Sequence, residues 1–192
     1  MNKIPLQDGE LYYHRDFLSQ EESKIYMEIL QQGISWEREE VVVFGKRHWV
    51  PRLVAWHGDP GVAYGYAGTK KEALGWTAEL EEIKNRIENV FPSASFNSVL
   101  LNYYRDGSDK MGWHSDDEKE LGVNPVIASV SLGATRRFDL RHKKTKEQIK
   151  IELSPGSLLI MSGSLQHHWH HSLPAQKRVQ SPRINLTFRR VF

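Results

Sequence analysis

The feature that most constrains the fold is a series of short alternating segments that fills the second half of the chain. These segments follow one another with no helical pattern between them: SVLLNYY, VIASVSL, RRFDL, IKIEL, SLLIMS and RINLTFRR. Turn-forming residues separate them, at Asp106-Gly107, Pro125, Gly133 and Pro155-Gly156. Many short strands without helices between them are typical of a β sandwich or barrel, and a double-stranded jelly roll is the form that encloses a site at one mouth.

Two helices are expected before this region. The first opens at Ser19, where Glu22 completes a capping box, and it ends near Gly33. The second begins near Thr77. Its apolar stripe consists of Leu80, Ile83, Ile87 and Val90. Both helices are predicted to pack outside the strands and to carry no chemistry.

The chain is expected to form a single domain over residues 1–192, because its length suits one hydrophobic core better than two. No repeat, low-complexity tract or linker interrupts it. We expect an N-terminal extension over about residues 10–97 and a jelly-roll core over about residues 98–192. The predicted fold class is therefore mixed α/β with a predominantly antiparallel β core and the N-terminal helices packed outside.

The last segment carries an unusual polar face. Side chains alternate along a strand, so Ile184, Leu186 and Phe188 share one face. The other face carries Arg183, Asn185, Thr187 and Arg189. LLNYY alternates in the same way and puts Asn102 and Tyr104 together. A solvated polar face is the ordinary explanation, but two arginines around Asn and Thr form fixed donors, and the planar guanidinium suits a carboxylate. Two such strands indicate a lined pocket.

A His-x-Asp pair, His114 and Asp116, lies in GWHSDDE between these strands. Residues two apart in an extended segment project the same way, so both can reach one ion. Two histidines and one carboxylate form the facial triad of non-heme Fe(II) sites. A lone His-x-Asp is a weak signal, and spacing alone leaves the third ligand open among His167, His168, His170 and His171.

Composition and charge limit the kinds of metal site, cellular location and partner that can be expected. The chain has no cysteine, which excludes disulfides, iron–sulfur clusters, thiolate zinc sites and cysteine nucleophiles. The N-terminus lacks the apolar run of a signal peptide, so we expect a cytoplasmic protein, or a nuclear one in a eukaryote. The net charge of +2 is too small to indicate a nucleic-acid partner by itself. Basic runs at residues 46–48, 141–146 and 177–178 are ordinary as solvated loops, but with six tryptophans they fit a surface that holds phosphates and stacks bases.

Taken together, these motifs resemble the catalytic core of the AlkB family of Fe(II)/2-oxoglutarate dioxygenases. The matching segments are NYYRDGSDKMGWHSDDE, IASVSLGATRRF, PGSLLIMSG, WHHSLP and SPRINLTFRR, and upstream VVVFGKRHWVPR and GVAYGYAG. The resemblance covers roughly residues 10–192. It implies Fe(II), 2-oxoglutarate as cosubstrate and O2. By this resemblance the iron ligands are His114, Asp116 and His171, with Arg189 near Asp116. The implied cosubstrate residues are Asn102, Tyr104, Arg183, Asn185, Thr187 and Arg189.

The upstream segments resemble the duplex-DNA branch of the family. Phe44 would be a finger that fills the stack vacated by a flipped base, although a core phenylalanine is the alternative. The substrate-binding residues implied are Val43, Phe44, Gly45, Lys46, Arg52, Trp56, Tyr64, Tyr66 and Asp117. The chain departs from the expected pattern at Tyr66 and Ala67, which puts the substrate preference in doubt.

The resemblance implies oxidative demethylation of N-alkylated DNA bases of the 1-methyladenine and 3-methylcytosine type. Formaldehyde would be released as 2-oxoglutarate is decarboxylated to succinate. The expected partner is DNA, in double-stranded form with a flipped base, and the expected state is a monomer. The alternatives are the same chemistry on single-stranded DNA, RNA or a protein side chain, a non-catalytic nucleic-acid-binding module, and a metal-dependent hydrolase.

Overall fold

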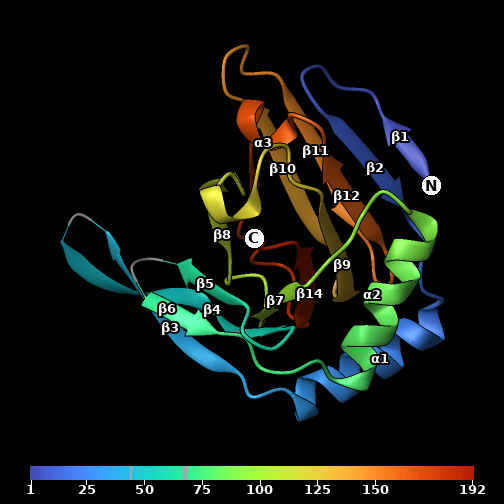
Figure 1. Cartoon of the computed structure of the whole chain (residues 1–192), viewed down its shortest axis with the longest axis vertical. Coiled ribbons are helices and arrows are strands. Elements are labelled where there is room, and N and C mark those ends of the chain that lie inside the picture. The colour runs from blue at the N-terminus through green and yellow to red at the C-terminus, as the bar shows by residue number, and fades with distance from the viewer. Residues whose placement is uncertain (44, 67–68) are drawn as a thin grey trace.

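The computed structural model describes residues 1–43, 45–66 and 69–192, with the side chains of residues 41–43, 46, 64–66 and 69–71 left undescribed. Two antiparallel sheets face each other, and two helices cover the outer face of the larger one (Figure 1). The larger sheet has the strand order β1-β2-β12-β9-β14-β7-β4-β3 and the smaller one β11-β10-β13-β8. The predicted jelly-roll architecture with a predominantly antiparallel core is confirmed.

The strands of the larger sheet come from both halves of the chain. They are β1 (Asn2–Ile4), β2 (Glu10–His14), β3 (Glu37–Val43), β4 (Lys46–Gly58), β7 (Ser98–Tyr104), β9 (Ile127–Gly133), β12 (Leu158–Ser162) and β14 (Arg183–Arg189). The smaller sheet consists of β8 (Met111–His114), β10 (Arg136–His142), β11 (Gln148–Leu153) and β13 (Trp169–Leu173), and β5 (Ala63–Tyr66) pairs with β6 (Thr69–Glu72). A 3-10 turn (Lys119–Leu121) and the short helix α3 (Leu165–His168) complete the elements. The N-terminal strands thus lie at both edges of the larger sheet, while the division at residue 97 stays a prediction.

Both long helices begin where the sequence predicts. Helix α1 (Gln20–Gly33) is capped by Ser19, whose side chain accepts from the Glu22 N–H while the Glu22 carboxylate accepts from the Ser19 N–H. Helix α2 (Ala78–Val90) is capped by Thr77. Leu80, Ile83 and Ile87 are fully buried, but Val90, predicted on the same stripe, is 44% exposed because the helix ends there.

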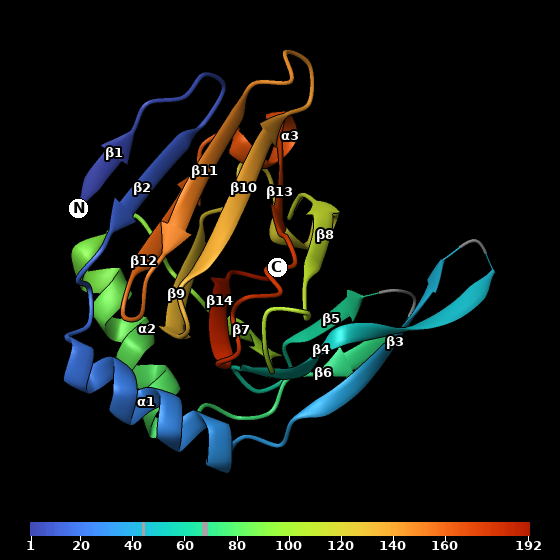
Figure 2. The same ribbon diagram turned by 180° about the vertical axis from the view of Figure 1, so that it is seen from behind.

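Two hydrophobic clusters hold these layers together. The first lies between the helices and the larger sheet and includes Leu30, Ile83, Leu101 and Leu186. The second lies between the two sheets and includes Trp169. Figure 2 shows the same layering from behind, with α1 and α2 on one side of the larger sheet. The chemistry-bearing side chains therefore sit in the space between the sheets, beside the second cluster.

The strand β14 occupies a central position, hydrogen-bonded to β9 on one side and β7 on the other. Its register aligns Asn185 with Asn102 and Arg183 with Tyr104 on β7. Gly133 ends β9 with a φ of +82°, and a Cβ there would lie 2.5 Å from the Pro182 carbonyl oxygen. Only glycine fits this turn, as its place among the turn signals indicates.

No helix in the described part of the chain combines the length and the apolar character that crossing a bilayer requires. Sequence reasoning did not identify β1, β2, β4, β6, β8 and β13 as strands. The last two are short and carry polar residues, so their alternation is too brief to be recognised.

Candidate metal centre and its polar cavity

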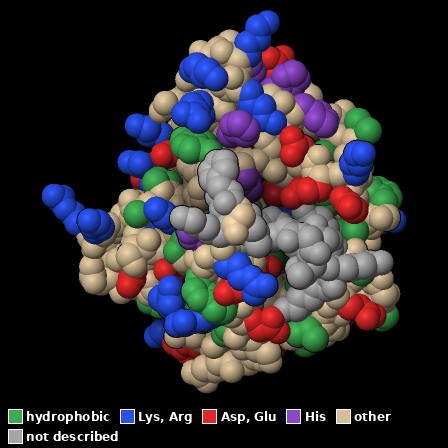
Figure 3. All heavy atoms as spheres, turned by 90° about the vertical axis from the view of Figure 1, so that its left-hand side faces the viewer, with side chains coloured by type: hydrophobic (Ala, Val, Ile, Leu, Met, Phe, Trp, Pro, Cys, Tyr) green, Lys and Arg blue, Asp and Glu red, His purple; other side chains and the backbone are tan. Residues whose placement is uncertain are grey.

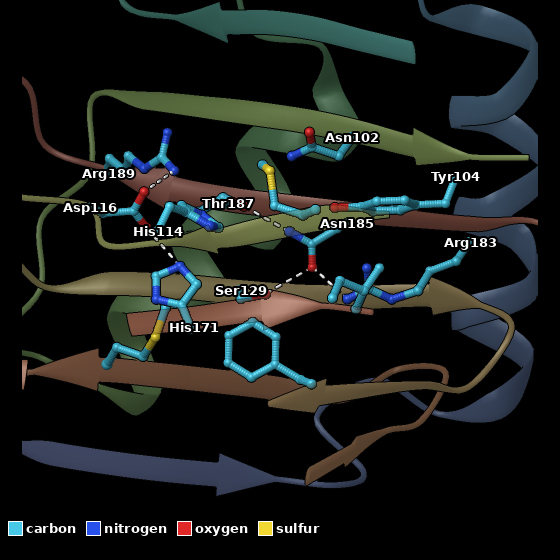
Figure 4. A pocket seen from close by; sticks show the side chains of 14 residues that line it. Asn102, Tyr104, His114, Asp116, Ser129, His171, Arg183, Asn185, Thr187 and Arg189 are labelled. Carbon is cyan, nitrogen blue, oxygen red and sulfur yellow. Dashed lines mark hydrogen bonds and ion pairs between the residues drawn. The ribbon is translucent and has the colours of Figure 1, made fainter. Parts of the chain in front are cut away.

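Three side chains from separate elements meet at one end of the space between the sheets. His114 ends β8, Asp116 follows it, and His171 lies on β13 directly opposite His114 in the strand register. Their ligand atoms all lie within 4.8 Å of one another, and the two imidazole rings are 4.2 Å apart (Figure 4). The structure thus brings together the three residues that the resemblance implied.

The donor set fits a divalent metal such as Fe(II). His171 Nε2 and Asp116 Oδ2 are 3.8 Å apart, too far for a hydrogen bond, although both side chains are buried. His114 Nδ1 lies 2.9 Å from the Gly112 carbonyl oxygen, to which it can only donate, so Nε2 keeps its lone pair. Burial and the nearby His114 lower the pKa of His171 to about 3, so its ring is neutral at physiological pH. Neutral imidazoles beside an ionised carboxylate are what the metal needs.

Asp116 is held from two directions. Burial alone would raise its pKa, but the charge of Arg189 and the neighbouring histidines outweigh it and hold the pKa below the ordinary value. Arg189 Nη2 donates to Asp116 Oδ1 over 2.7 Å. The Asp116 N–H donates to Gln166 Oε1 over 3.0 Å, and Gln166 is fully buried on α3. Sequence reasoning did not single out Gln166, because an amide beside the histidine cluster carries no distinguishing pattern.

A polar cavity adjoins the metal centre. The polar faces predicted for β7 and β14 both line it, with Asn102, Tyr104, Arg183, Asn185, Thr187 and Arg189. The opposite faces of the same strands lie in the first hydrophobic cluster. The remaining lining residues are Met111, Ser129, Phe138, Met161 and Leu173 together with the three metal-centre residues. Ser129 lies on β9, whose VIASVSL alternation would have revealed it as a third polar face.

Arg183 is the buried cation of this cavity. Its Nη2 donates to Ser131 Oγ over 2.8 Å and to Asn185 Oδ1 over 2.7 Å. Burial lowers its pKa to about 10, so the guanidinium stays charged at neutral pH. Among the described residues no carboxylate pairs with it, and its Nε has no hydrogen-bond partner. A buried cation with only neutral partners favours an anionic ligand.

The donors around Asn185 form a chain across the cavity wall. Asn185 Oδ1 accepts from Ser129 Oγ over 2.8 Å as well as from Arg183. Its Nδ2 donates to Thr187 Oγ1 over 2.7 Å. Figure 4 shows Arg183, Asn185 and Thr187 of β14 and Ser129 of β9 lining the same space as the metal centre. The wall is therefore held together by hydrogen bonds between its own side chains.

A second group, Asp8, His142 and His168, also brings ligand atoms within 4.8 Å of one another. His142 is buried, and its Nδ1 accepts from the Thr145 backbone N–H over 3.0 Å. The proton of the neutral ring is therefore on Nε2, 3.2 Å from Asp8 Oδ2. A protonated Nε2 offers no lone pair to a metal ion, and among the described residues it approaches Asp8 without forming a hydrogen bond. Because His142 is buried, it does not contribute to a basic surface.

The predicted nucleotide-recognition residues are only partly described. Phe44 lies outside the described residues, as do the side chains of Val43, Lys46, Tyr64 and Tyr66. Gly45 is exposed in the turn of the β3–β4 hairpin, with a φ of +75°. The hairpin projects from the body of the protein (Figure 1). Glycine suits this position, because a positive φ is unfavourable for residues with a Cβ.

Three other predicted substrate residues are described in full. Trp56 is 6% exposed in the second hydrophobic cluster and does not line the cavity. Asp117 is exposed, 3.3 Å from Lys143 Nζ. Arg52 is 4% exposed, and its Nε donates to Asn102 Oδ1 over 2.6 Å. The structure does not bring these three to one wall of the cavity.

The surface at the hairpin end carries charges of both signs. Figure 3 faces this end and shows Lys and Arg side chains in several groups near its upper and left edges, with acidic side chains between them. Arg47, Lys144, Lys177 and Arg178 are all exposed. Arg141 stacks on the half-exposed ring of Trp113 at 4.5 Å. The mixture of positive and negative side chains on this surface agrees with the small net charge of the chain.

Comparisons with known proteins agree with this geometry. The family model of the 2OG-Fe(II) oxygenase superfamily matches residues 10–189. The chain is 42% identical over 181 residues to the mouse DNA oxidative demethylase ALKBH2, covering 89% of this chain and 75% of that protein. It is 39% identical over 185 residues to the mouse alpha-ketoglutarate-dependent dioxygenase alkB homolog 3, covering 92% and 64%. The solved structure of OsALKBH1 has a TM-score of 0.70 at 18% identity, covers 97% of this chain and 100% of that one, and supports the fold.

The chain spans between 57% and 75% of the lengths of the curated relatives it matches. The segments shared with the listed relatives cover 79% to 95% of this chain.

Proposed function

The chain belongs to the 2OG-Fe(II) oxygenase superfamily and, within it, to the AlkB family; we therefore propose that it oxidatively removes N-methyl groups from damaged DNA bases. The relatives that carry the name DNA oxidative demethylase support this assignment. The lesions proposed are of the 1-methyladenine and 3-methylcytosine type, in which the methyl group blocks the pairing edge of the base. Members of the superfamily use Fe(II), 2-oxoglutarate and O2.

The observation that carries the proposal is the buried, carboxylate-free Arg183 in the same cavity as the His-Asp-His group. A hydrolase that used the same metal ligands would bind no anionic cosubstrate beside its substrate, so it would not need this buried cation. A 2-oxo dicarboxylic acid, by contrast, needs one end near the metal and a cation for the far end. The cavity offers both.

We assign His114, Asp116 and His171 as the iron ligands. Arg189 keeps Asp116 ionised and oriented, and the Gly112 carbonyl fixes the tautomer of His114. Such partners of ligating residues typically change metal affinity by about 10–100-fold when they are removed. When bound together, Fe(II), 2-oxoglutarate and O2 supply the oxidation that hydroxylates the N-methyl group, yielding succinate, carbon dioxide, formaldehyde and the restored base.

The polar wall is assigned to 2-oxoglutarate. Arg183 pairs with the distal carboxylate, because its fork matches two carboxylate oxygens and its present partners are neutral. Tyr104 contributes the face of its ring, 5.4 Å from the Arg183 guanidinium carbon. Asn102, Asn185 and Thr187 complete the cosubstrate wall. Arg189 serves both the C1 end of the cosubstrate and Asp116.

The DNA is proposed to be double-stranded, with the damaged base flipped into the site. The β3–β4 hairpin supports this, since it projects beyond the sheet and turns at Gly45. Phe44 would fill the vacated stack, with Val43 and Lys46 beside it, and Trp56, Tyr64, Tyr66 and Asp117 would contribute to base recognition. We propose a monomer, acting in the cytoplasm or, in a eukaryote, in the nucleus.

The decisive experiment is anaerobic reconstitution with Fe(II), followed by addition of O2 and 2-oxoglutarate with methylated oligonucleotides. We expect formaldehyde and succinate in equal amounts from 1-methyladenine or 3-methylcytosine in duplex DNA, and none from an unmethylated duplex. Matched single-stranded DNA, RNA and a methylated peptide test the other substrates of the same chemistry. Turnover without O2 would indicate a hydrolase, and binding of DNA without 2-oxoglutarate turnover a non-catalytic module.

A further inference from the structure

Arg52 lies beside the cavity wall, on the strand next to it, and is not one of the residues that line the cavity. It belongs to β4, next to β7 in the larger sheet, and is 4% exposed. Its Nε donates to Asn102 Oδ1 over 2.6 Å, and Asn102 is 2% exposed. Asn102 in turn lines the cavity. A buried, charge-assisted hydrogen bond therefore connects a strand outside the cavity to one of its lining amides.

This hydrogen bond decides which end of the Asn102 amide serves the cavity. Arginine can only donate, so it must hold the oxygen of the amide and never the nitrogen. The Nδ2 donor is then the end left for a ligand. Figure 4 shows the Asn102 nitrogen turned toward the other cavity side chains and the oxygen turned away. A flipped amide would instead present its oxygen to a carboxylate and repel it.

We propose that Arg52 is a positioning residue for the cosubstrate: it locks Asn102 as a hydrogen-bond donor toward an anionic 2-oxo acid. This inference rests on the proposed function. It gives Arg52 a different role from the base contact that the sequence indicated, and nothing in the chain's similarity to its relatives assigns it.

The position of Arg52 along β4 agrees with this role. It lies six residues after Lys46, where the strand leaves the hairpin turn. At about 3.3 Å per residue, Arg52 is roughly 20 Å along the strand from the hairpin tip. It is too far from the tip to take part in contacts made there, but it is in direct contact with Asn102 of the cavity wall.

The test compares Arg52→Met, Arg52→Lys, Asn102→Ala and the Arg52→Met/Asn102→Ala double variant. Calorimetric titration of 2-oxoglutarate into Mn(II)-loaded enzyme without O2 gives the cosubstrate Kd independently of turnover. A second titration gives the Kd for a methylated duplex, and formaldehyde release gives the KM and kcat. Arg86→Met is the matched control, because Arg86 is a partly buried arginine that pairs with Glu22, away from the cavity.

We expect Arg52→Met to weaken 2-oxoglutarate binding about tenfold, equivalent to about 1.4 kcal/mol, with a raised KM and duplex binding within twofold of wild type. In the Asn102→Ala background the same change should add little, because the amide it orients is gone. Arg52→Lys keeps the charge and should recover part of the loss. Arg86→Met should leave both Kd values unchanged.

Asn102→Asp provides a second measurement if Arg52→Met does not fold. With Arg52 holding one carboxylate oxygen, the other would face the cavity, and 2-oxoglutarate should bind more weakly than in Asn102→Ala. Binding as tight as wild type would overturn the proposal. So would an Arg52→Met enzyme that loses duplex affinity alone, or one that loses cosubstrate affinity equally with and without Asn102. If wild-type enzyme bound no 2-oxoglutarate at all, the proposed function itself would fail, which is a separate result.

Discussion

Arg189 donates to Asp116 over 2.7 Å, and both side chains are more than nine-tenths buried between the two sheets. The pair joins the last residue of the core strand β14 to the carboxylate of the metal centre. Because the arginine holds one carboxylate oxygen, the other is left on the side of His171. The geometry explains how a carboxylate can stay ionised where burial alone would favour its neutral form.

Replacing Arg189 should therefore lower the affinity for the metal more than it lowers the stability of the fold. We expect Arg189→Met to reduce Fe(II) affinity by about 10–100-fold, as typically seen when the partner of a metal ligand is removed. Competition with a chelator under anaerobic conditions measures the effect. Arg190→Met is the control, since Arg190 is the next residue but is exposed and contacts Ser95. Equal losses in the two variants would contradict the role assigned to Arg189.

Within the histidine cluster, the structure separates His171 from His168. His171 is buried at the metal centre, and His168 is exposed. We expect His171→Ala to abolish turnover and metal binding, and His168→Ala to keep most of both. Circular dichroism should show both variants folded, because the sheets close without the ion. An active His171→Ala enzyme would require a different third ligand.

Arg183 is predicted to hold the far carboxylate of 2-oxoglutarate. Removing one partner of a buried charge pair costs about 2–5 kcal/mol, so Arg183→Met should raise the cosubstrate Kd by roughly 30- to several thousandfold. Arg183→Lys should rescue little, because a point charge does not reproduce the fork. Titration into Mn(II)-loaded enzyme measures both, with the exposed Arg178→Met as control. An unchanged Kd in Arg183→Met would remove the main support for the proposed function.

Phe44 is predicted to contribute to repair only in duplex DNA, where a flipped base leaves a gap in the base stack. We expect Phe44→Ala to lower repair of duplex DNA by roughly ten- to a hundredfold, from a stacking contribution of about 1–3 kcal/mol, while repair of single strands is nearly unchanged. A phenylalanine in the core predicts another outcome, namely equal loss on both substrates with about 3–5 kcal/mol lower stability. Both activities and the Tm should be measured on the same preparation.

The capping box of α1 predicts an acid-sensitive contribution to stability. Arg86 and the Ser19 N–H lower the pKa of Glu22 from 4.5 to about 2. A carboxylate with a lowered folded pKa stabilises the fold above its unfolded value, so this contribution is full above about pH 4.5 and is lost toward pH 2. Because the Glu22 side chain is 42% exposed, we expect no more than about 1 kcal/mol, or about 2–4 °C in Tm. The Tm of Glu22→Gln should therefore be lower than that of the wild type at pH 7 and equal to it at pH 2.

The sequence predicted the parts of the fold whose patterns are long and local. The capping box at Ser19 and the alternation along residues 183–189 each specify a backbone conformation and a buried face without outside help. The short strands β8 and β13 were missed, since their conformation comes from pairing with each other rather than from their own residues. The choice of His171 came from resemblance, because only the register of β13 against β8 decides which histidine faces inward.

The supporting residues of the site were the hardest to foresee. Gln166 and Arg52 contact their partners across 50 residues of chain, so no local pattern reveals either contact. The resemblance singled out Arg52, but as a substrate-binding residue. Ser129 and Ser131 could have been predicted, because they share one face of the alternating segment VIASVSL. Side chains that act through another residue are visible only when the packing between strands is known.

The strand β14 carries its polar wall and its hydrophobic anchor on alternate residues. An inserted or deleted residue would therefore exchange the two sets, burying arginines among leucines and emptying the cavity of its donors. For this reason β14 does not tolerate insertions or deletions. The β3–β4 hairpin shares no such constraint, because its turn lies beyond the sheet. Insertions and deletions should therefore be tolerated at the protruding hairpin turn and not within β14.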